Sequence, residues 1–231
     1  MRKVLLALVF LAVLLVVADR SAAALGERAL SRELQATAEL AEPPEVSVTG
    51  FPFLTQALRG RYDRVEVTAA DVPVADTTLT GFEAVLSGLR VPLSDVLSDS
   101  VEQVHVDRLE ARVLLSYDDL ARRSLDRELT VSPAGDRVRV TGRVRVLGRE
   151  LEASAVSTVT LEDDDVVVTA ESFEVGSGTA DRLLTRALRG RFDLSVPVGG
   201  LAYGLQVQSL QVTPNGIAAR ALAQDTVLTT P

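Results

Sequence analysis

The side chains that most often carry out chemistry are scarce in this sequence. Its 231 residues include one histidine, His105, and no cysteine or tryptophan. Zinc, iron–sulfur and thiol chemistry therefore lack their usual ligands and nucleophiles. His105 alternates with Val104 and Val106, which predicts a strand on which the histidine faces solvent. No serine and acid are placed to work with it, so the sequence predicts no enzyme, no metal site and no cofactor.

Charged clusters could instead bind ions. The four consecutive acids at residues 162–165 could hold a cation, but side chains on one tight turn point apart, so we interpret them as a solvated turn. An arginine face could bind an anion, but we expect it to pair with acids on neighbouring strands. The arginines are Arg139, Arg143 and Arg145, and the candidate partners are Glu150, Glu152 and Glu171. The net charge of −8 argues against nucleic acid as a partner.

The most specific feature of the sequence is an internal repeat. Residues 54–63 (LTQALRGRYD) recur at residues 184–193 (LTRALRGRFD), with eight of ten positions identical. Each copy has the pattern of a short amphipathic helix that ends at a glycine and continues as a strand. Gly60 and Gly190 are therefore predicted to adopt the left-handed conformation that ends a helix.

Two interpretations of the repeated helices are open. In the first, each helix closes an open end of a sheet core, and its arginines are ordinary solvated residues. In the second, the helices lie at the mouth of an apolar groove, where apolar side chains reach lipid and arginines meet phosphate headgroups. The lipid-binding candidates are then Phe51, Phe53, Leu54, Leu58, Leu184 and Leu188. The headgroup candidates are Arg59, Arg61, Arg186, Arg189 and Arg191.

The N-terminus has the pattern of an export signal or a membrane anchor. Met1-Arg2-Lys3 precedes 15 consecutive apolar residues, 4–18, and an A-x-A-like cleavage sequence lies at 22–24. The run is short for a membrane span, which needs about 20 apolar residues. Helix-forming residues continue to Leu40, so residues 1–24 could be either a cleaved signal peptide or a retained anchor. Both alternatives place the rest of the protein outside the cytoplasm, and we expect it in the cell envelope. A retained N-terminal segment would make the membrane surface a partner.

The body of the chain has the periodicity of strands. After Pro43-Pro44 apolar residues alternate with polar ones, most clearly at residues 138–146, and turn signals between the runs favour antiparallel pairing. Short helices are predicted at residues 52–59, 92–97, 118–129 and 180–189, and Ser116 can cap the third. Because no polar linker divides the body, residues 25–231 are predicted to form one α+β domain with an extensive antiparallel sheet.

Residues 50–67 (GFPFLTQALRGRYDRVEV) resemble the LmeA-type phospholipid-binding family of actinobacterial cell-envelope proteins. Two further features fit that family's pattern: an apolar N-terminal segment ending at Asp19-Arg20, and a Gly-Leu-x-Val-x-x-Leu-x-Val-x-x-x-Gly stretch at residues 204–216. The likeness covers nearly the whole chain. Residues 196–201 (VPVGGL) differ from the proline-rich turn usual in the family.

The resemblance implies an extracytoplasmic protein that binds phospholipid and supports assembly of envelope lipids or glycolipids. It also implies a fold similar to the tubular lipid-binding proteins, in which a strongly curved antiparallel sheet wraps a long helix around an apolar tunnel. The alternative function is that of a structural or scaffolding envelope protein whose sheet is packed and holds no ligand. Phospholipid bound to the purified protein would separate the two.

Overall fold

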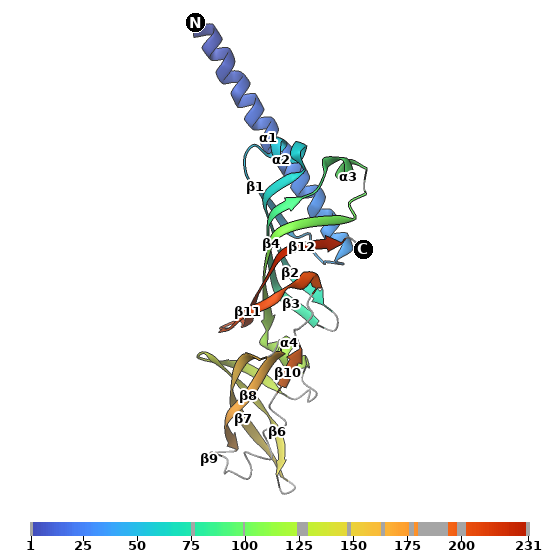
Figure 1. Ribbon diagram of the computed structural model, residues 1–231. Helices are drawn as coiled ribbons and strands as arrows, with labels where there is room; N and C mark the ends of the chain where they lie inside the picture. The colour runs from blue at the N-terminus through green and yellow to red at the C-terminus, as the bar shows by residue number, and fades with distance from the viewer. Residues whose placement is uncertain are drawn as a thin grey trace. The chain divides into compact units, whose positions relative to one another are not determined.

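The computed structural model describes residues 2–74, 77–98, 100–123, 129–146, 149–162, 165–175, 178–179, 194–197 and 202–229. These residues form one long N-terminal helix, α1 (Arg2–Thr37), and two antiparallel sheets of six strands each (Figure 1). The predicted α+β class with extensive antiparallel pairing is confirmed, and the strands are divided between two sheets.

The first sheet has the spatial order β1-β2-β3-β4-β12-β11. Its strands are β1 (Glu45–Thr49), β2 (Arg61–Val74), β3 (Thr77–Arg90), β4 (Gln103–Ser116), β12 (Gly216–Thr229) and β11 (Gln206–Thr213). Among the described residues, the short helices are α2 (Phe53–Arg59), α3 (Leu93–Leu97) and α4 (Tyr117–Arg123), and a 3₁₀ turn covers Ala202–Gly204. The predicted helices at 52–59 and 92–97 are therefore present, and α4 forms the start of the one predicted at 118–129. Residues 124–128 lie outside the described residues and residue 129 is not helical, so that helix does not reach 129 as predicted. The helix predicted at 180–189 lies outside the described residues.

The second sheet has the order β10-β8-β7-β6-β5, with β9 paired to β8. Its strands are β5 (Thr130–Ala134), β6 (Arg137–Val146), β7 (Arg149–Glu162), β8 (Asp165–Val175), β9 (Gly178–Thr179) and β10 (Leu194–Pro197). Strands β5 to β8 pair with their sequence neighbours in antiparallel register, as the short turns between them predicted.

The chain forms two compact units. Unit 1 contains Met1–Ala70, Glu83–Ala111 and Ala223–Pro231, and unit 2 contains Asp71–Phe82 and Arg112–Leu222. Four strands, β2, β3, β4 and β12, each contribute residues to both units, so the division does not fall in a linker. That residues 25–231 fold as one domain stays a prediction.

Unit 2 has a buried apolar core around Phe173. Phe173, Val138 and Val140 are each 1% exposed, and Ala155, the register partner of Phe173, is equally buried. The two valines alternate along β6 with residues of the opposite face, as the sequence pattern predicted. The hydroxyl of Tyr117 donates a hydrogen bond to the carbonyl oxygen of Thr213, which ties α4 to the end of β11.

The arginines of β6 pair with acids of the same sheet. Arg137 bonds to Glu171, and a guanidinium nitrogen of Arg139 lies 3.3 Å from the carboxylate of Glu174. The register places Glu152 opposite Arg143 and Glu150 opposite Arg145. Pairing of the arginine face with acids is thus observed at Arg139, and its partner Glu174 is not among the predicted acids.

Helix α4 begins with a reciprocal cap. The Oγ of Ser116 accepts the backbone N–H of Asp119 at 3.2 Å and donates to the Asp119 carboxylate, which also binds Arg122. Burial alone would raise the pKa of the Asp119 carboxyl. The hydrogen bonds from Ser116 and Arg122 and the charge of Arg122 outweigh that effect, so this pKa lies below its usual value. The predicted capping role of Ser116 is confirmed.

We expect Asp119→Asn to destabilise the protein at neutral pH by about 1 kcal/mol, because it weakens the cap and the bond to Arg122. A pKa that is lowered in the folded state means that the ionised carboxylate stabilises the fold above the ordinary carboxyl pKa. This contribution is lost as the pH falls through the folded-state value. Urea midpoints of wild type and variant should therefore converge between about pH 7 and about pH 3. A difference that stays constant over this range would contradict the assignment.

Candidate functional site

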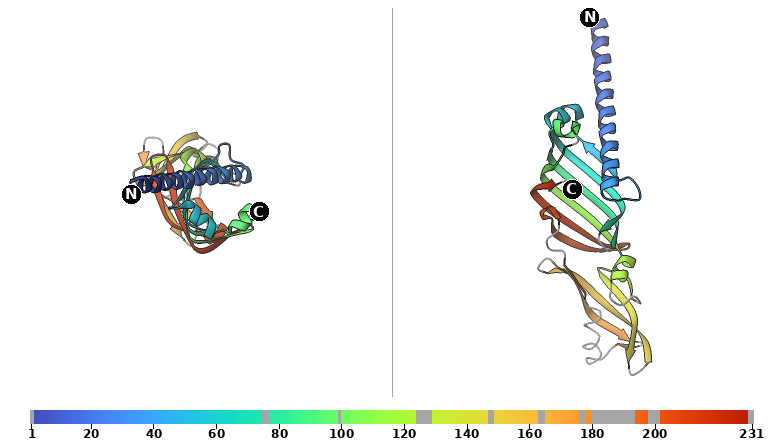
Figure 2. Two further views of the ribbon diagram at one scale, coloured as in Figure 1. Left: turned by 90° about the horizontal axis from the view of Figure 1, so that it is seen from above. Right: turned by 90° about the vertical axis from the view of Figure 1, so that its right-hand side faces the viewer.

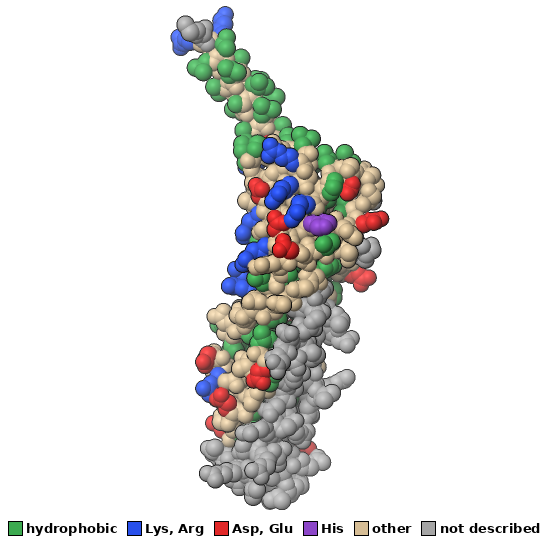
Figure 3. Space-filling view, viewed as in Figure 1, with side chains coloured by type: hydrophobic (Ala, Val, Ile, Leu, Met, Phe, Trp, Pro, Cys, Tyr) green, Lys and Arg blue, Asp and Glu red, His purple; other side chains and the backbone are tan. Residues whose placement is uncertain are grey.

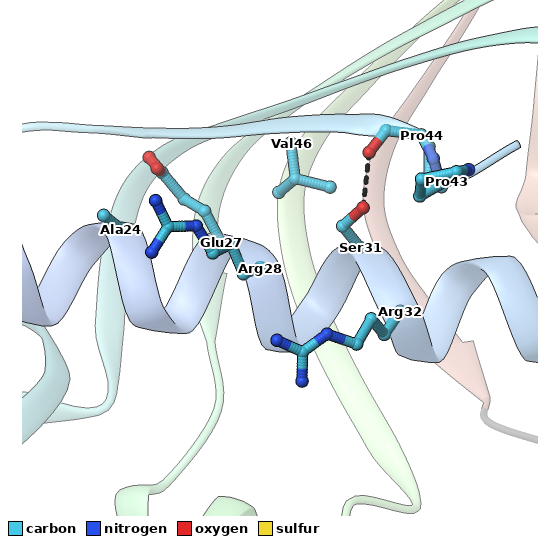
Figure 4. Close-up of a pocket in the computed structure, with 8 residues that line it drawn as sticks. All are labelled: Ala24, Glu27, Arg28, Ser31, Arg32, Pro43, Pro44 and Val46. Atoms are coloured by element: carbon cyan, nitrogen blue, oxygen red, sulfur yellow. Dashed lines mark hydrogen bonds between the residues drawn. The ribbon is translucent and has the colours of Figure 1, made fainter.

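Helix α1 is tied to the body of unit 1 by side chains spaced four residues apart. Glu27 Oε1 accepts the backbone N–H of Val48 in β1 at 2.8 Å. One turn further, Ser31 Oγ donates to the carbonyl oxygen of Pro44 at 2.6 Å (Figure 4). The two preceding positions in this series, Asp19 and Ala23, are buried. We call Asp19, Ala23, Glu27 and Ser31 the contact row, because residues four apart share one face of a helix.

The contact row also explains how the edge of the first sheet is protected. Among the described residues, strand β1 is the end strand of that sheet and pairs with β2. An unpaired strand edge exposes backbone groups that can pair with other chains. In this protein α1 lies along β1, and Glu27 satisfies the N–H of Val48 (Figure 2). Residues 19–31 are therefore part of the folded body as well as the continuation of the apolar N-terminal segment.

Asp19 fixes the start of α2. Its side chain is almost completely buried, and Oδ1 accepts the backbone N–H of Leu54 at 2.8 Å. The N–H groups of a first helical turn have no partner within the helix, and Pro52 supplies no side-chain cap. The guanidinium carbon of Arg20 lies 5.3 Å from the centre of the Phe51 ring, within cation–π range. Two consecutive residues of α1 thus hold the segment from which α2 begins.

Gly60 ends α2 in the left-handed conformation, with φ 61° and ψ 28°. The prediction for this residue is confirmed, whereas Gly190 and the whole second copy of the repeat lie outside the described residues. The carbonyl oxygen of Gly60 accepts the N–H of Val91 at 2.9 Å, which connects α2 to the residues that precede α3. The buried Gln56 accepts the N–H of Asp63 at 2.9 Å, so the start of β2 is held by α2 as well.

We expect Gly60→Ala to destabilise the protein by about 2–4 kcal/mol. A Cβ at this position would meet backbone atoms at 2.7 Å (Val91 O) and 2.9 Å (Pro92 Cα), in addition to the strain of a positive φ. Gly135→Ala is the matched control: its φ is 73°, but a Cβ there meets nothing within 4 Å, so only the backbone strain of about 1 kcal/mol applies. Equal shifts of the urea midpoint in the two variants would contradict this close approach.

The α2 and α3 end of unit 1 carries exposed apolar side chains. Leu58 and Leu97 are 75% and 79% exposed, Phe51 is 57% exposed, and Leu54 and Val96 are also exposed. We call these five residues the tip surface. Helix α3 contacts α2, and both lie at the end of unit 1 from which the apolar part of α1 projects (Figures 1 and 2). In the space-filling view, apolar side chains continue from the projecting helix over this end (Figure 3).

The structure separates the predicted lipid-binding residues. Phe51, Leu54 and Leu58 belong to the tip surface, whereas Phe53 is half-buried. The Phe53 ring centre lies 6.2 Å from that of Tyr62, and Phe53 Cζ would lie 3.4 Å from a Cβ built on Gly26 of α1. Phe53 thus packs between α1 and β2. Leu184 and Leu188 lie outside the described residues, so the lipid contacts of all six stay predictions.

The predicted headgroup arginines also differ in their surroundings. Arg59 is exposed in the last turn of α2. Arg61 lies 3.4 Å from the carboxylate of Asp107, which also binds Arg90, so its charge is partly matched within the protein. Arg186, Arg189 and Arg191 lie outside the described residues. Arg59 follows Leu58 of the tip surface in sequence, but the contact of these arginines with headgroups stays a prediction.

Two surface hollows stand out in the described residues. One of about 380 Å³ lies between α1 and the residues leading into β1, and Arg28 and Arg32 are among its lining residues (Figure 4). The other, of about 420 Å³, is lined by Thr130, Thr141, Gly142, Arg143 and Glu152. Both are open and include charged side chains. The apolar tunnel implied by the family resemblance stays a prediction.

The chemical groups considered from the sequence are not assembled into a reactive cluster in the described part of the chain. His105 is exposed on β4 beside the buried Val106, as predicted. No group of three or more histidine, cysteine or acidic side chains that could hold a metal ion occurs among the residues that the structure describes. The acidic turn includes residues 163 and 164, which lie outside the described residues. Helix α1 is long and apolar enough to cross a membrane.

The fold and the site define an α+β protein whose apolar N-terminal helix leads directly into a sheet with an exposed apolar end. The chain belongs to the LmeA-like phospholipid-binding family, whose family model matches residues 17–221. The predicted family is thereby confirmed, and phospholipid binding is the property that the family's description gives. The matched region includes the whole contact row of α1. Neither a curated protein nor a solved structure matches the chain.

Proposed function

We propose that this protein is an extracytoplasmic phospholipid-binding protein of the cell envelope that is held at the membrane by α1. In this role it supports the assembly of envelope lipids or glycolipids. The observation that carries the proposal is the family match over residues 17–221. The apolar segment of α1, which follows Arg2 and Lys3, supports export and attachment to the membrane.

In the proposed mature protein, α1 is an anchor that is not cleaved. The A-x-A-like sequence at residues 22–24 lies inside the continuous helix, and Ala23 is buried against the body. Cleavage after Ala24 would remove the bond from Asp19 to Leu54 and the stacking of Arg20 on Phe51. These contacts support a mature protein that retains residues 1–24, because they organise the start of α2.

We further propose that the protein holds phospholipid without reacting with it. The exposed position of His105 and the ion pairs that hold Asp107 and Asp119 within the fold support a binding function. The second candidate is a scaffolding envelope protein without ligand, which the buried apolar core of unit 2 around Phe173 favours. Lipid occupancy of the purified protein distinguishes the two functions.

Location and anchoring are tested by fractionation of native host cells. We expect the full-length protein to stay with membranes after washing with high salt. In spheroplasts, an added protease that does not cross the membrane should digest the body. Full-length protein in the washed cytosolic fraction, or digestion only after lysis, would contradict the location.

The role in lipid assembly is tested by deleting the gene and measuring the envelope lipids and glycolipids by mass spectrometry. We expect at least one class to fall and to recover when the wild-type gene is returned. An unchanged lipid profile would contradict the assembly role, and it would leave phospholipid binding to be judged by occupancy alone.

A further inference from the structure

The tip surface brings together apolar side chains that the fold of unit 1 does not bury. Leu58 and Leu97 come from different helices and are 75% and 79% exposed. Helices α2 and α3 are joined through the Gly60–Val91 hydrogen bond, so the position of the two leucines is set by the backbone. A clustered apolar surface of this kind marks a contact with a partner or a membrane more often than isolated exposed residues do.

The position of the tip surface along α1 identifies its partner. The apolar run of α1 ends at Ala18, and the next residue, Asp19, binds Leu54 of the tip surface. Arg20 then stacks on Phe51, another tip residue. The tip surface is thus attached to the helix at the point where the apolar segment gives way to charged residues. For a helix that crosses a bilayer, that point lies at the boundary between hydrocarbon and headgroups.

The length of the apolar run strengthens this placement. Fifteen residues of α-helix extend about 22 Å, whereas the hydrocarbon core of a bilayer is about 30 Å thick. A span that is too short is accommodated by local thinning of the bilayer or by drawing flanking residues into it. In this protein the flanking residues are held against the tip surface, which would move into the leaflet with them.

We propose that the tip surface inserts into the leaflet in which the apolar segment of α1 ends. Its partner is then the lipid of that leaflet, at the boundary between headgroups and acyl chains. This inference rests on the proposed function only in that α1 is retained as a membrane anchor. Arg20 and Arg59 lie beside the apolar residues, where long basic side chains reach phosphate groups while their stems stay in apolar surroundings. Insertion would fix the α2 end of unit 1 against the membrane.

The absence of cysteine from the natural sequence allows a direct test. Single-cysteine variants Leu58→Cys, Leu97→Cys and Ala36→Cys of the full chain are labelled with a polarity-sensitive fluorophore and reconstituted into phosphatidylcholine–phosphatidylglycerol vesicles. All three positions are exposed, so the labels leave the core intact. Ala36 is the control, because it lies on the same helix about 27 Å beyond Ala18.

Quenching by lipids that carry a nitroxide near the headgroup should be several-fold stronger at positions 58 and 97 than at position 36. Equal, weak quenching at all three positions would overturn the inference, and strong quenching at only one of the two leucines would overturn it for the other helix. The lipid content of the same samples before reconstitution reports separately on the proposed function. Bound phospholipid with an unquenched tip would contradict only this inference, and a quenched tip without bound phospholipid would contradict only the binding function.

Discussion

Two aspartates in the apolar part of α1, introduced as Val9→Asp with Val13→Asp, should release the protein from membranes. The two valines are exposed and lie four residues apart, so both charges would face lipid from one side of the helix. A charged residue at the centre of a membrane helix costs about 2.5–3.5 kcal/mol on insertion scales, so the pair costs about 5–7 kcal/mol. Membrane partitioning should therefore fall by more than about a thousandfold. Flotation of the full chain with phospholipid vesicles measures this change.

The control for this variant adds the same charges outside the apolar segment, as Ala29→Asp with Ala36→Asp. Both alanines are exposed in the half of α1 that accompanies the body. The control should float with vesicles as the wild type does. If the Val9→Asp, Val13→Asp variant also floated, α1 would not be the element that holds the protein at the membrane, and the anchor would have to lie elsewhere in the chain.

Phe173→Ala should destabilise the protein by about 3–5 kcal/mol, the usual cost of removing a buried aromatic side chain. Phe173 is 1% exposed and packs in the core of unit 2 with Val138, Val140 and Ala155. This loss is a large fraction of the free energy of unfolding of a typical domain, which is about 5–15 kcal/mol. The urea midpoint by circular dichroism gives the change, with the slope of the transition checked for two-state behaviour.

Phe51→Ala is the matched control for Phe173→Ala. The ring of Phe51 is 57% exposed and its cation–π contact with Arg20 contributes about 0.5–1 kcal/mol at an exposed site. The control should thus lose no more than about 1 kcal/mol of stability. A loss as large as that of Phe173→Ala would show that Phe51 is needed for folding, which would argue against a lipid-facing role for the tip surface.

Features determined by neighbouring residues were predicted well from the sequence. The left-handed Gly60 follows from its place after an amphipathic turn, and the cap at Ser116 follows from the acids in the next turn. The alternation of Val138 and Val140 with arginines indicated which face of β6 is buried, and both valines are 1% exposed. In each case the spacing that defines the element lies within ten residues, so a single stretch of sequence contains the information.

Features that depend on distant segments were not predicted. The sequence shows the four-residue spacing that places the contact row on one face of α1. Its hydrogen-bond partners at Leu54, Val48 and Pro44 lie in other segments and are known only from the fold.

The separation of Phe53 from Phe51 likewise depends on packing against Tyr62 and α1. Helix α3 was predicted, but its contribution of Val96 and Leu97 to the tip surface was not, because it requires the contact between α2 and α3. The candidate site could therefore be located from the sequence at α2, although its extent could not.

The central claim is that the body of this protein binds phospholipid, and native mass spectrometry of the full chain tests it most directly. The measurement is made on wild type in a detergent that is not a phospholipid, and on Val9→Asp, Val13→Asp without detergent, so that lipid carried by the apolar part of α1 is distinguished from lipid held by the body. We predict, for both proteins, an additional mass equal to one phospholipid that is released on unfolding. Both proteins at the mass of the polypeptide alone would contradict phospholipid binding and favour the scaffolding function.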